Sequence, residues 1–293
     1  MSTSDALEHY RSFTSKVFSK ANRKRNGIFK ATTLEVGMKQ VIKASSERCN
    51  GDEYMIKGNA VTGLGKRNVS YVFQSCQTDA NLGCSVVCAL PMFNTRFPRL
   101  FRTYPNPTNS STGEDCTIWQ AVRATMASPT LFKAVKIQML GGIVEEFVDA
   151  GYKCNNPSVI ILGEAADLFG ANSSIGPFLS IGAGHPGIIK LPKADRFQQA
   201  LLKTLTDISE DCEHIVDELK KRFSEIPHIY TRFNVSHGLG VDNLEEGQIF
   251  THVKTYLADV GVSQQVDQVV RSLVSGVPPG SSVTLGTMSK YSG

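Results

Sequence analysis

The first two elements predicted along the chain are amphipathic helices. Apolar side chains recur three or four positions apart over residues 3–20, which is the spacing of one face of a helix. A second helix is expected from Thr32 onwards, because Glu35 follows Thr32 at the spacing of a capping box. The stretch 50–66 is rich in glycine and asparagine and predicts a surface loop.

Short, β-branched and apolar stretches follow, and they predict strands. Residues 68–75 and 84–91 are expected at the centre of a sheet that is covered on both faces. Helical patterns alternate with further strands, and this alternation predicts an α/β fold in three layers. The further strands are expected at residues 99–105, 141–149, 176–184 and 228–235, and the helices at 116–129, 155–169, 194–223, 248–257 and 264–274.

Composition and charge narrow the classes of partner. The 293 residues are 41% hydrophobic, enough for a substantial core. The net charge of +4 suits an anionic membrane surface or substrate but demands neither, and the basic run at residues 20–25 is typical of a solvated helix end. We therefore expect no nucleic-acid partner. The polar start of the chain and the lack of a long apolar run predict a soluble cytoplasmic protein, at most peripheral to a membrane.

The cysteines and histidines do not predict a metal or cofactor site. There are seven cysteines and no C-x-x-C, which favours a reducing compartment. Cys84 and Cys88 would share one face of a buried strand and pack there as small apolar groups. The six histidines are scattered without the spacing of metal ligands. No metal and no cofactor is expected.

Two polar residues in predicted elements invite a functional reading. Asp149 ends a predicted strand, where an aspartate is commonly a turn former but can also be a general base held at the sheet edge. Arg123 lies on the predicted helix 116–129. There an arginine usually extends along the surface, and it could equally pair with a carboxylate in the core. Both alternatives stay open for each residue.

The segment "GAGHPG" at Gly182 to Gly187 has the G-x-G-x-x-G form of a dinucleotide-binding loop and follows a predicted strand. Pro186 and the residues after it do not start a helix at the glycines, so the match lacks the helix N-terminus that holds a pyrophosphate. The ordinary interpretation is a strand-to-helix turn, with His185 as a turn residue. The chain contains neither the G-x-S-x-G of a serine hydrolase nor a G-x-x-x-x-G-K-[ST] phosphate loop.

Three segments together resemble the fungal-type patatin-like phospholipase family. "IWQAVRATMASPTLF" is similar to the family's helix I-W-x-A-x-R-A-T-x-A-A-P-x-x-F. "EEFVDAGYKCNNP" is similar to its F-x-D-G-G/A-x-x-x-N-N-P, and "FLSIGAG" to its strand L-S-I-G-T-G. "YTRFNV" also resembles a late strand of such proteins. The order and spacing agree over about Ser4 to Leu273.

The resemblance implies a three-layer α/β/α fold that hydrolyses acyl esters of phospholipids or other glycerolipids. Catalysis in the family resembles that of a Ser-Asp dyad, and the position of the dyad aspartate, the proton acceptor, is Asp149 here. The resemblance also implies supporting residues around the dyad aspartate. In the same motif these are Ala150, Gly151, Asn155, Asn156 and Pro157, and in the helix motif the supporting residue is Arg123. Ala150 stands where the family has glycine.

The resemblance also implies an incomplete domain. The family's nucleophile elbow and its oxyanion turn D-G-G-G-x-R-G are not in this sequence, and residues 1–10 resemble the helix that follows the elbow. We therefore expect a patatin-like domain over residues 1–240 that lacks its N-terminal part. A helical extension over residues 241–275 and a disordered tail over residues 276–293 would follow.

Without the serine, the chain as written is expected to be catalytically inactive. The first hypothesis is a lipid acyl hydrolase whose complete form carries the nucleophile. The alternatives are a non-catalytic lipid-binding relative and a dinucleotide-binding protein that uses Gly182 to Gly187.

Overall fold

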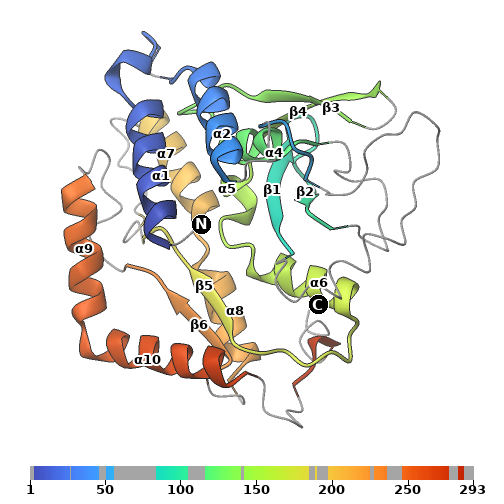
Figure 1. Cartoon of the computed structure of the whole chain (residues 1–293), viewed down its shortest axis with the longest axis vertical. Helices are drawn as coiled ribbons and strands as arrows, with labels where there is room; N and C mark the ends of the chain where they lie inside the picture. The colour runs from blue at the N-terminus through green and yellow to red at the C-terminus, as the bar shows by residue number, and fades with distance from the viewer. Residues whose placement is uncertain are drawn as a thin grey trace. The chain divides into compact units, whose positions relative to one another are not determined.

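The chain folds as two compact units, Met1–Lys153 and Cys154–Gly293. A computed structural model describes residues 3–26, 28–45, 51–55, 84–104, 116–139, 142–184, 189, 197–224, 228–235, 246–276 and 283–286 (Figure 1). The described part is mixed α/β, as the sequence predicts in outline. The boundary at residues 153 and 154 falls inside the predicted domain 1–240, where no boundary was expected. The predicted strand 68–75 and His185 lie outside the described residues.

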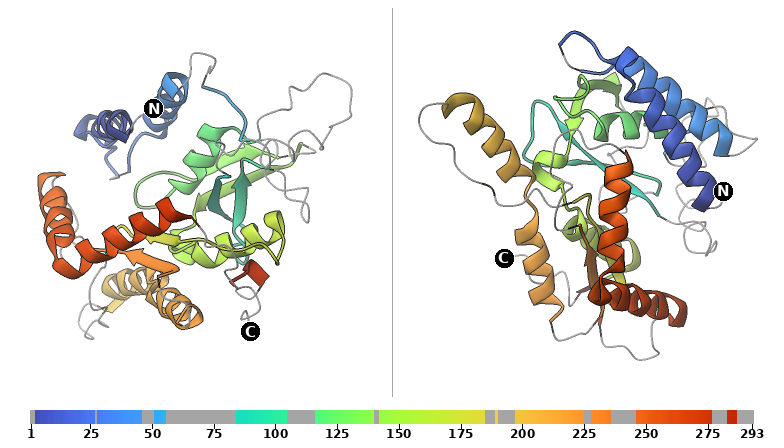
Figure 2. Two further views of the ribbon diagram at one scale, coloured as in Figure 1. Left: turned by 60° about the horizontal axis from the view of Figure 1, so that its bottom comes forward. Right: turned by 90° about the vertical axis from the view of Figure 1, so that its left-hand side faces the viewer.

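The first unit opens with two helices that lie side by side (Figure 2). They pack around a cluster of the fully buried side chains Val17, Leu34 and Phe132. The predicted capping box at Thr32 is wrong, because the second helix already begins one residue earlier and Thr32 lies inside it. These helices are α1 (Thr3–Val17) and α2 (Ala31–Ser45), joined through the short 3-10 helix η1 (Lys20–Asn22).

A four-stranded sheet in the order β2-β1-β4-β3 forms the centre of the first unit. All three neighbouring pairs are antiparallel. Short connections join β1 to β2 and β3 to β4, as antiparallel pairing allows. Strand β3 was not among the predicted elements. Its signal was the alternation of buried Val135 and Ile137 with exposed Lys136 and Gln138. The strands are β1 (Val86–Pro91), β2 (Arg99–Arg102), β3 (Val135–Gln138) and β4 (Val144–Asp149).

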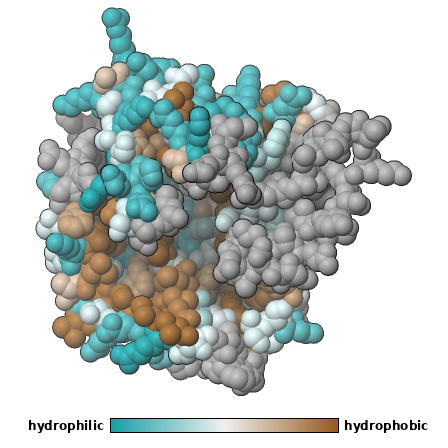
Figure 3. Space-filling view, viewed as in Figure 1, coloured by the Kyte–Doolittle hydropathy of each residue, from teal (hydrophilic) through white to brown (hydrophobic). Residues whose placement is uncertain are grey.

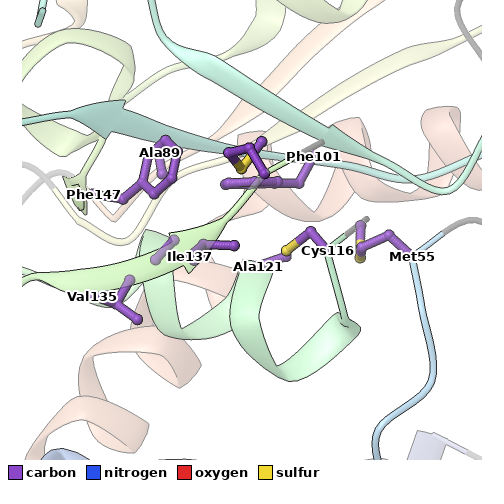
Figure 4. Close-up of a cluster of buried hydrophobic side chains, with 10 residues drawn as sticks. Met55, Ala89, Phe101, Cys116, Ala121, Val135, Ile137 and Phe147 are labelled. Carbon is purple, nitrogen blue, oxygen red and sulfur yellow. The ribbon is translucent and has the colours of Figure 1, made fainter. Parts of the chain in front are cut away.

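Helix α4 (Ile118–Thr125) packs against this sheet. It starts with a capping box in which the Thr117 hydroxyl accepts from the Gln120 backbone N–H, and the Gln120 side chain accepts from the N–H of Thr117. Apolar side chains of the sheet and the helix meet in one cluster (Figure 4). The buried members of that cluster are Met55, Ala89, Phe101, Cys116, Ala121, Ala124, Val135, Ile137, Met139 and Phe147.

The second unit is built around two parallel strands, β5 (Phe178–Ile181) and β6 (Tyr230–Phe233). The predicted single helix over residues 194–223 is wrong, because it is two helices separated at Asp211 and Cys212. The Asp211 side chain accepts from the backbone N–H of Glu213 at 3.1 Å and so starts a new helix there. The helices of this part are α5 (Gly151–Cys154, at the boundary), α6 (Ser158–Phe169), α7 (Phe197–Glu210), α8 (Glu213–Arg222), α9 (Glu246–Ala258) and α10 (Val260–Ser275).

Two residues of the predicted disordered tail take part in the core of the second unit. Val283 and Leu285 are buried beside Leu162 and Leu219, and Thr284 forms a bridge with Ser174. The alternation of apolar and polar residues over 283–286 is that of a half-buried strand. The expectation of disorder therefore does not hold for these four residues.

Helices α9 and α10 carry many apolar side chains at the surface. Figure 3 shows them along the lower left, where Figure 1 places these two helices. Both helices form where the sequence predicts them. Within the described residues, no helix has the length and apolar character needed to span a bilayer. The exposed apolar side chains of the two helices are Ile249, Phe250, Leu257, Val260, Val270, Leu273 and Val274.

Candidate functional site

Asp149 is the last residue of β4 and pairs with Ala89 of β1. Its backbone N–H donates to the carbonyl of Ala127, 3.2 Å away, in the segment that follows α4. The strand end is thus fixed on two sides by main-chain contacts. The sheet places Asp149 at a strand end, as the sequence predicts.

The carboxylate of Asp149 is half-buried and held by its own chain. Its Oδ1 accepts from the backbone N–H of Gly151 at 3.0 Å. Burial raises the pKa of Asp149 above the ordinary aspartate value, while hydrogen bonds from the backbone N–H groups of Gly151 and Ala150 partly oppose that rise. Among the described residues no cationic side chain forms an ion pair with it. A carboxylate in this state takes up a proton more readily than one at the surface.

The two residues after Asp149 are small and closely packed. Ala150 is buried, and a Cβ added to Gly151 would stand 3.3 Å from Asp149 Oδ2. A larger side chain at Gly151 would therefore press on the carboxylate. Because these residues are small, the backbone after β4 can approach the Asp149 carboxylate closely.

Arg123 is a core residue of the first unit. Its side chain is 1% exposed, so the surface interpretation is wrong. Nη2 donates to the carbonyl of Lys133 at 2.5 Å, and Nε lies 3.7 Å from the Glu35 carboxylate, which confirms the pairing with a carboxylate. Burial lowers the pKa of Arg123, and Glu35 partly offsets that effect. The guanidinium also lies over the ring of Phe132. Arg123 thus joins α4 to α2.

Asn155, Asn156 and Pro157 belong to the second unit, where they form the start of α6. Asn155 Nδ2 donates to the carbonyl of Glu210 at 2.6 Å. Asn156 is buried, and its Oδ1 accepts from the backbone N–H of Ser158 at 3.2 Å and from its hydroxyl at 2.6 Å. The helix begins at Ser158, and Pro157 is its N-cap residue. These side chains fix how the chain enters α6.

A network of polar side chains in the second unit extends from Ser158, and it was not predicted from the sequence. The Ser158 hydroxyl lies 3.4 Å from that of Ser180 on β5. Arg232 on β6 donates from Nη1 to Ser180 at 2.7 Å and from Nη2 to Cys212 Sγ at 3.4 Å. Burial raises the pKa of the Cys212 thiol, and the charge of Arg232 partly opposes this. The signal in the sequence was a polar residue, Ser180 or Arg232, inside each of two short strands that begin with an aromatic residue.

Packing explains the first two glycines of "GAGHPG". A Cβ on Gly182 would overlap Asn234 Oδ1 and stand 2.8 Å from Arg232 Nη2. Gly184 has φ +117°, a conformation that side chains rarely adopt, and its N–H donates to Asn234 Oδ1 at 2.9 Å. Both glycines thus let the end of β5 close onto the end of β6. The remaining residues of the motif, 185–187, lie outside the described part of the chain.

No protein-family model matches the chain, and a search of curated proteins finds no significant match. In the part of the chain that the structure describes, no three His, Cys, Asp or Glu side chains gather as metal ligands would. The function is therefore inferred from the side chains and the sequence motifs.

Proposed function

We propose that Asp149 is the base of a Ser-Asp dyad that hydrolyses acyl esters of phospholipids or other glycerolipids. The observation that supports this most directly is the state of the Asp149 carboxylate. It is half-buried, it is fixed by the Gly151 N–H at 3.0 Å, and burial raises its pKa. A general base needs a rigid position and an increased proton affinity. The motif around it is the one in which the patatin-like family carries its dyad aspartate.

In the proposed reaction, Asp149 accepts the proton of a serine hydroxyl as the serine oxygen attacks the ester carbonyl. The tetrahedral intermediate collapses, the C–O bond to the glycerol breaks, and the leaving oxygen takes the proton back from Asp149. Water then cleaves the acyl-serine by the same route, giving the free fatty acid. No G-x-S-x-G occurs in these 293 residues, so the proposal assigns the serine to a segment outside them.

The proposal includes a three-layer α/β/α fold. The packing of α4 against the four-stranded sheet of the first unit is compatible with one such layer on a sheet. A glycerolipid substrate would bring the protein to a membrane surface, which the net charge of +4 suits where that surface is anionic. Peripheral contact with a membrane is part of the proposal.

The test starts from the 5′ end of the native transcript, translated in frame through Met1. The longest product is then purified and assayed for fatty-acid release from phospholipid vesicles. Asp149→Asn should abolish the release while Asp217→Asn, an exposed aspartate on α8, should leave it unchanged. A product without any G-x-S-x-G, or hydrolysis that survives Asp149→Asn, would refute the dyad.

A second candidate is a lipid-binding protein without catalysis. The apolar side chains exposed on α9 and α10 favour it, since exposed apolar patches commonly mark interaction surfaces. Vesicle flotation of the purified chain tests this candidate. Val274→Asp, at a position that is 83% exposed, should reduce flotation without loss of folded protein. Equal flotation of both proteins would count against α10 as the lipid-facing element.

A further inference from the structure

The second unit contains a cavity of about 240 Å³ between α8, β6 and α10. This volume is below the usual range of drug-sized ligand sites, so the cavity suits a small ligand. Its walls are polar on every element that contributes to it. The residues that line it are Lys220, His228, Tyr230, Thr231, Arg232, Gln265 and Gln268.

The charge of the cavity is one-sided. Lys220 and Arg232 bring two cations to its wall, and among the residues that the structure describes no aspartate or glutamate lines it. Within the described residues neither cation forms an ion pair. Two like charges without a counter-ion attract an anion, and the attraction is stronger in a recess than on an open surface.

Arg232 is held in position before any ligand arrives. Its Nη1 donates to Ser180 at 2.7 Å and its Nη2 to Cys212 at 3.4 Å. These contacts fix the guanidinium, so a ligand would not have to immobilise it. Preorganisation of this kind reduces the entropy cost of binding.

Two buried donors belonging to residues of the wall have no acceptor. In the described part of the chain, Arg232 Nε and the Tyr230 hydroxyl are both buried without a hydrogen-bond partner. Buried donors that lack an acceptor are unfavourable, and a nearby negative charge offsets that cost. The Arg232 Nε–H can only donate, so its missing acceptor agrees with a negatively charged ligand, whereas the Tyr230 hydroxyl can donate or accept.

We propose that this cavity binds a phosphate group, either as free phosphate or as the phosphomonoester of a small molecule or lipid headgroup. The guanidinium and the ammonium would neutralise the charge of the phosphate. The amides of Gln265 and Gln268, one turn apart on α10, would donate to its remaining oxygens. The site is built from residues of the second unit alone, and the proposal does not depend on ester hydrolysis.

Lys220 and Lys221 provide a matched pair for the test. They are neighbours on α8 and both are exposed, but only Lys220 lines the cavity. Lys220→Ala and Lys221→Ala therefore remove the same charge inside and outside the site. Gln265→Glu adds a carboxylate to the wall from an exposed position and should weaken binding as well.

The experiment titrates the purified chain with sodium phosphate and with glycerol 3-phosphate by calorimetry, against sodium chloride at equal ionic strength. We expect saturable binding that Lys220→Ala weakens about tenfold, while Lys221→Ala stays within about twofold of the wild type. Thermal unfolding should show the same order, since a ligand of the native state raises Tm. Flotation with phosphatidic acid in phosphatidylcholine vesicles, against phosphatidylcholine alone, tests the lipid source.

Each outcome either identifies the source of the bound phosphate group or overturns the proposal. Dependence on Lys220 with the soluble phosphates assigns a free phosphate or small phosphomonoester. Dependence on Lys220 with the phosphatidic acid vesicles alone assigns a lipid headgroup. No saturable binding of any probe, or equal loss in the two lysine variants, would overturn the proposal.

Discussion

Gly151 lies against the carboxylate of the residue two positions before it. Its N–H donates to Asp149 Oδ1 at 3.0 Å, and the space where its side chain would start is 3.3 Å from Oδ2. The chain therefore both bonds to this carboxylate and limits the room around it. An aspartate held in this way is kept in its orientation by its own turn of the chain.

Asp149→Asn should stabilise the protein at neutral pH. The raised pKa means that the folded state holds the proton to higher pH than the unfolded state does. The free energy of unfolding therefore falls as the pH rises from the ordinary aspartate pKa through the folded value, and it stays lower above that value. Asparagine keeps the Oδ1 acceptor without the charge. We therefore expect the free energy of unfolding of the variant to exceed that of the wild type at about pH 7.

Urea unfolding from about pH 3 to about pH 8 measures this gain. The two proteins should converge at the acid end, where Asp149 is protonated in both states. Asp217→Asn, at an exposed position on α8, is the control, and it should leave the free energy of unfolding unchanged at both acid and neutral pH. A loss of stability in Asp149→Asn at neutral pH would contradict the raised pKa.

Two glycine-to-alanine substitutions should change the free energy of unfolding in opposite directions. Gly182→Ala would place a methyl group against Asn234 and Arg232, whose side chains are held by bonds to Gly184 and to β5. We expect the free energy of unfolding to fall by about 1–3 kcal/mol. Gly163, inside α6, has nothing within 4 Å of an added Cβ, so Gly163→Ala should gain about 0.5–1 kcal/mol.

Denaturant unfolding of both glycine variants provides the comparison. Asn234→Gly combined with Gly182→Ala should recover part of the loss, because it removes the atom that the new methyl group meets. A Gly182→Ala protein as stable as the wild type would show that β5 and β6 do not approach as closely as described.

Arg123→Ala should lower the free energy of unfolding by about 3 kcal/mol. The substitution removes a charge-assisted hydrogen bond to the Lys133 carbonyl. It also leaves a cavity in the core, because the Arg123 side chain is only 1% exposed. Arg123→Met should cost less, because methionine fills the volume and removes two buried nitrogens, Nε and Nη1, that have no hydrogen-bond partner among the described residues. Urea titration ranks the two variants. Equal losses would mean that packing contributes little at this position.

The Cys116 thiol should not react in the folded protein. It is fully buried, and burial raises its pKa to about 12, so the reactive thiolate is scarce at neutral pH. Iodoacetamide labelling followed by mass spectrometry should modify Cys116 only after unfolding in urea. The partly exposed Cys154 serves as the internal reference. Labelling of Cys116 in native buffer at the rate seen in urea would contradict the described core.

Local patterns predicted most of the described elements. The strand before Asp149, the helix around Arg123 and the helices α9 and α10 lie where periodicity placed them, because each has a clear apolar repeat. The break at Asp211 was missed, since an aspartate is compatible with a helix surface and only its bond to Glu213 ends one helix and starts the next. Strand β3 was missed as well; its two apolar residues, Val135 and Ile137, alternate with the polar Lys136 and Gln138.

Pairing and burial depend on distant residues and could not be predicted in the same way. The sequence suggested a three-layer arrangement but did not indicate that β1 and β4 pair antiparallel through Ala89 and Asp149. The contacts of Arg232 with Ser180 and Cys212 join segments that are 52 and 20 positions apart. Nothing local in either strand specifies such partners.

The pairing of β5 with β6 also affects how the second unit folds. Phe178 and Tyr230 are aligned in the parallel pair, and the difference of their positions, 52 residues, is the loop that must close before the first strand contact forms. Closure of a long loop costs entropy before any contact compensates for it, so non-local pairing slows folding. During synthesis, β5 leaves the ribosome well before its partner, with Leu179 and Ile181 on a strand that has no neighbour yet. The order in which the chain is made therefore creates an interval when this strand is open to wrong partners.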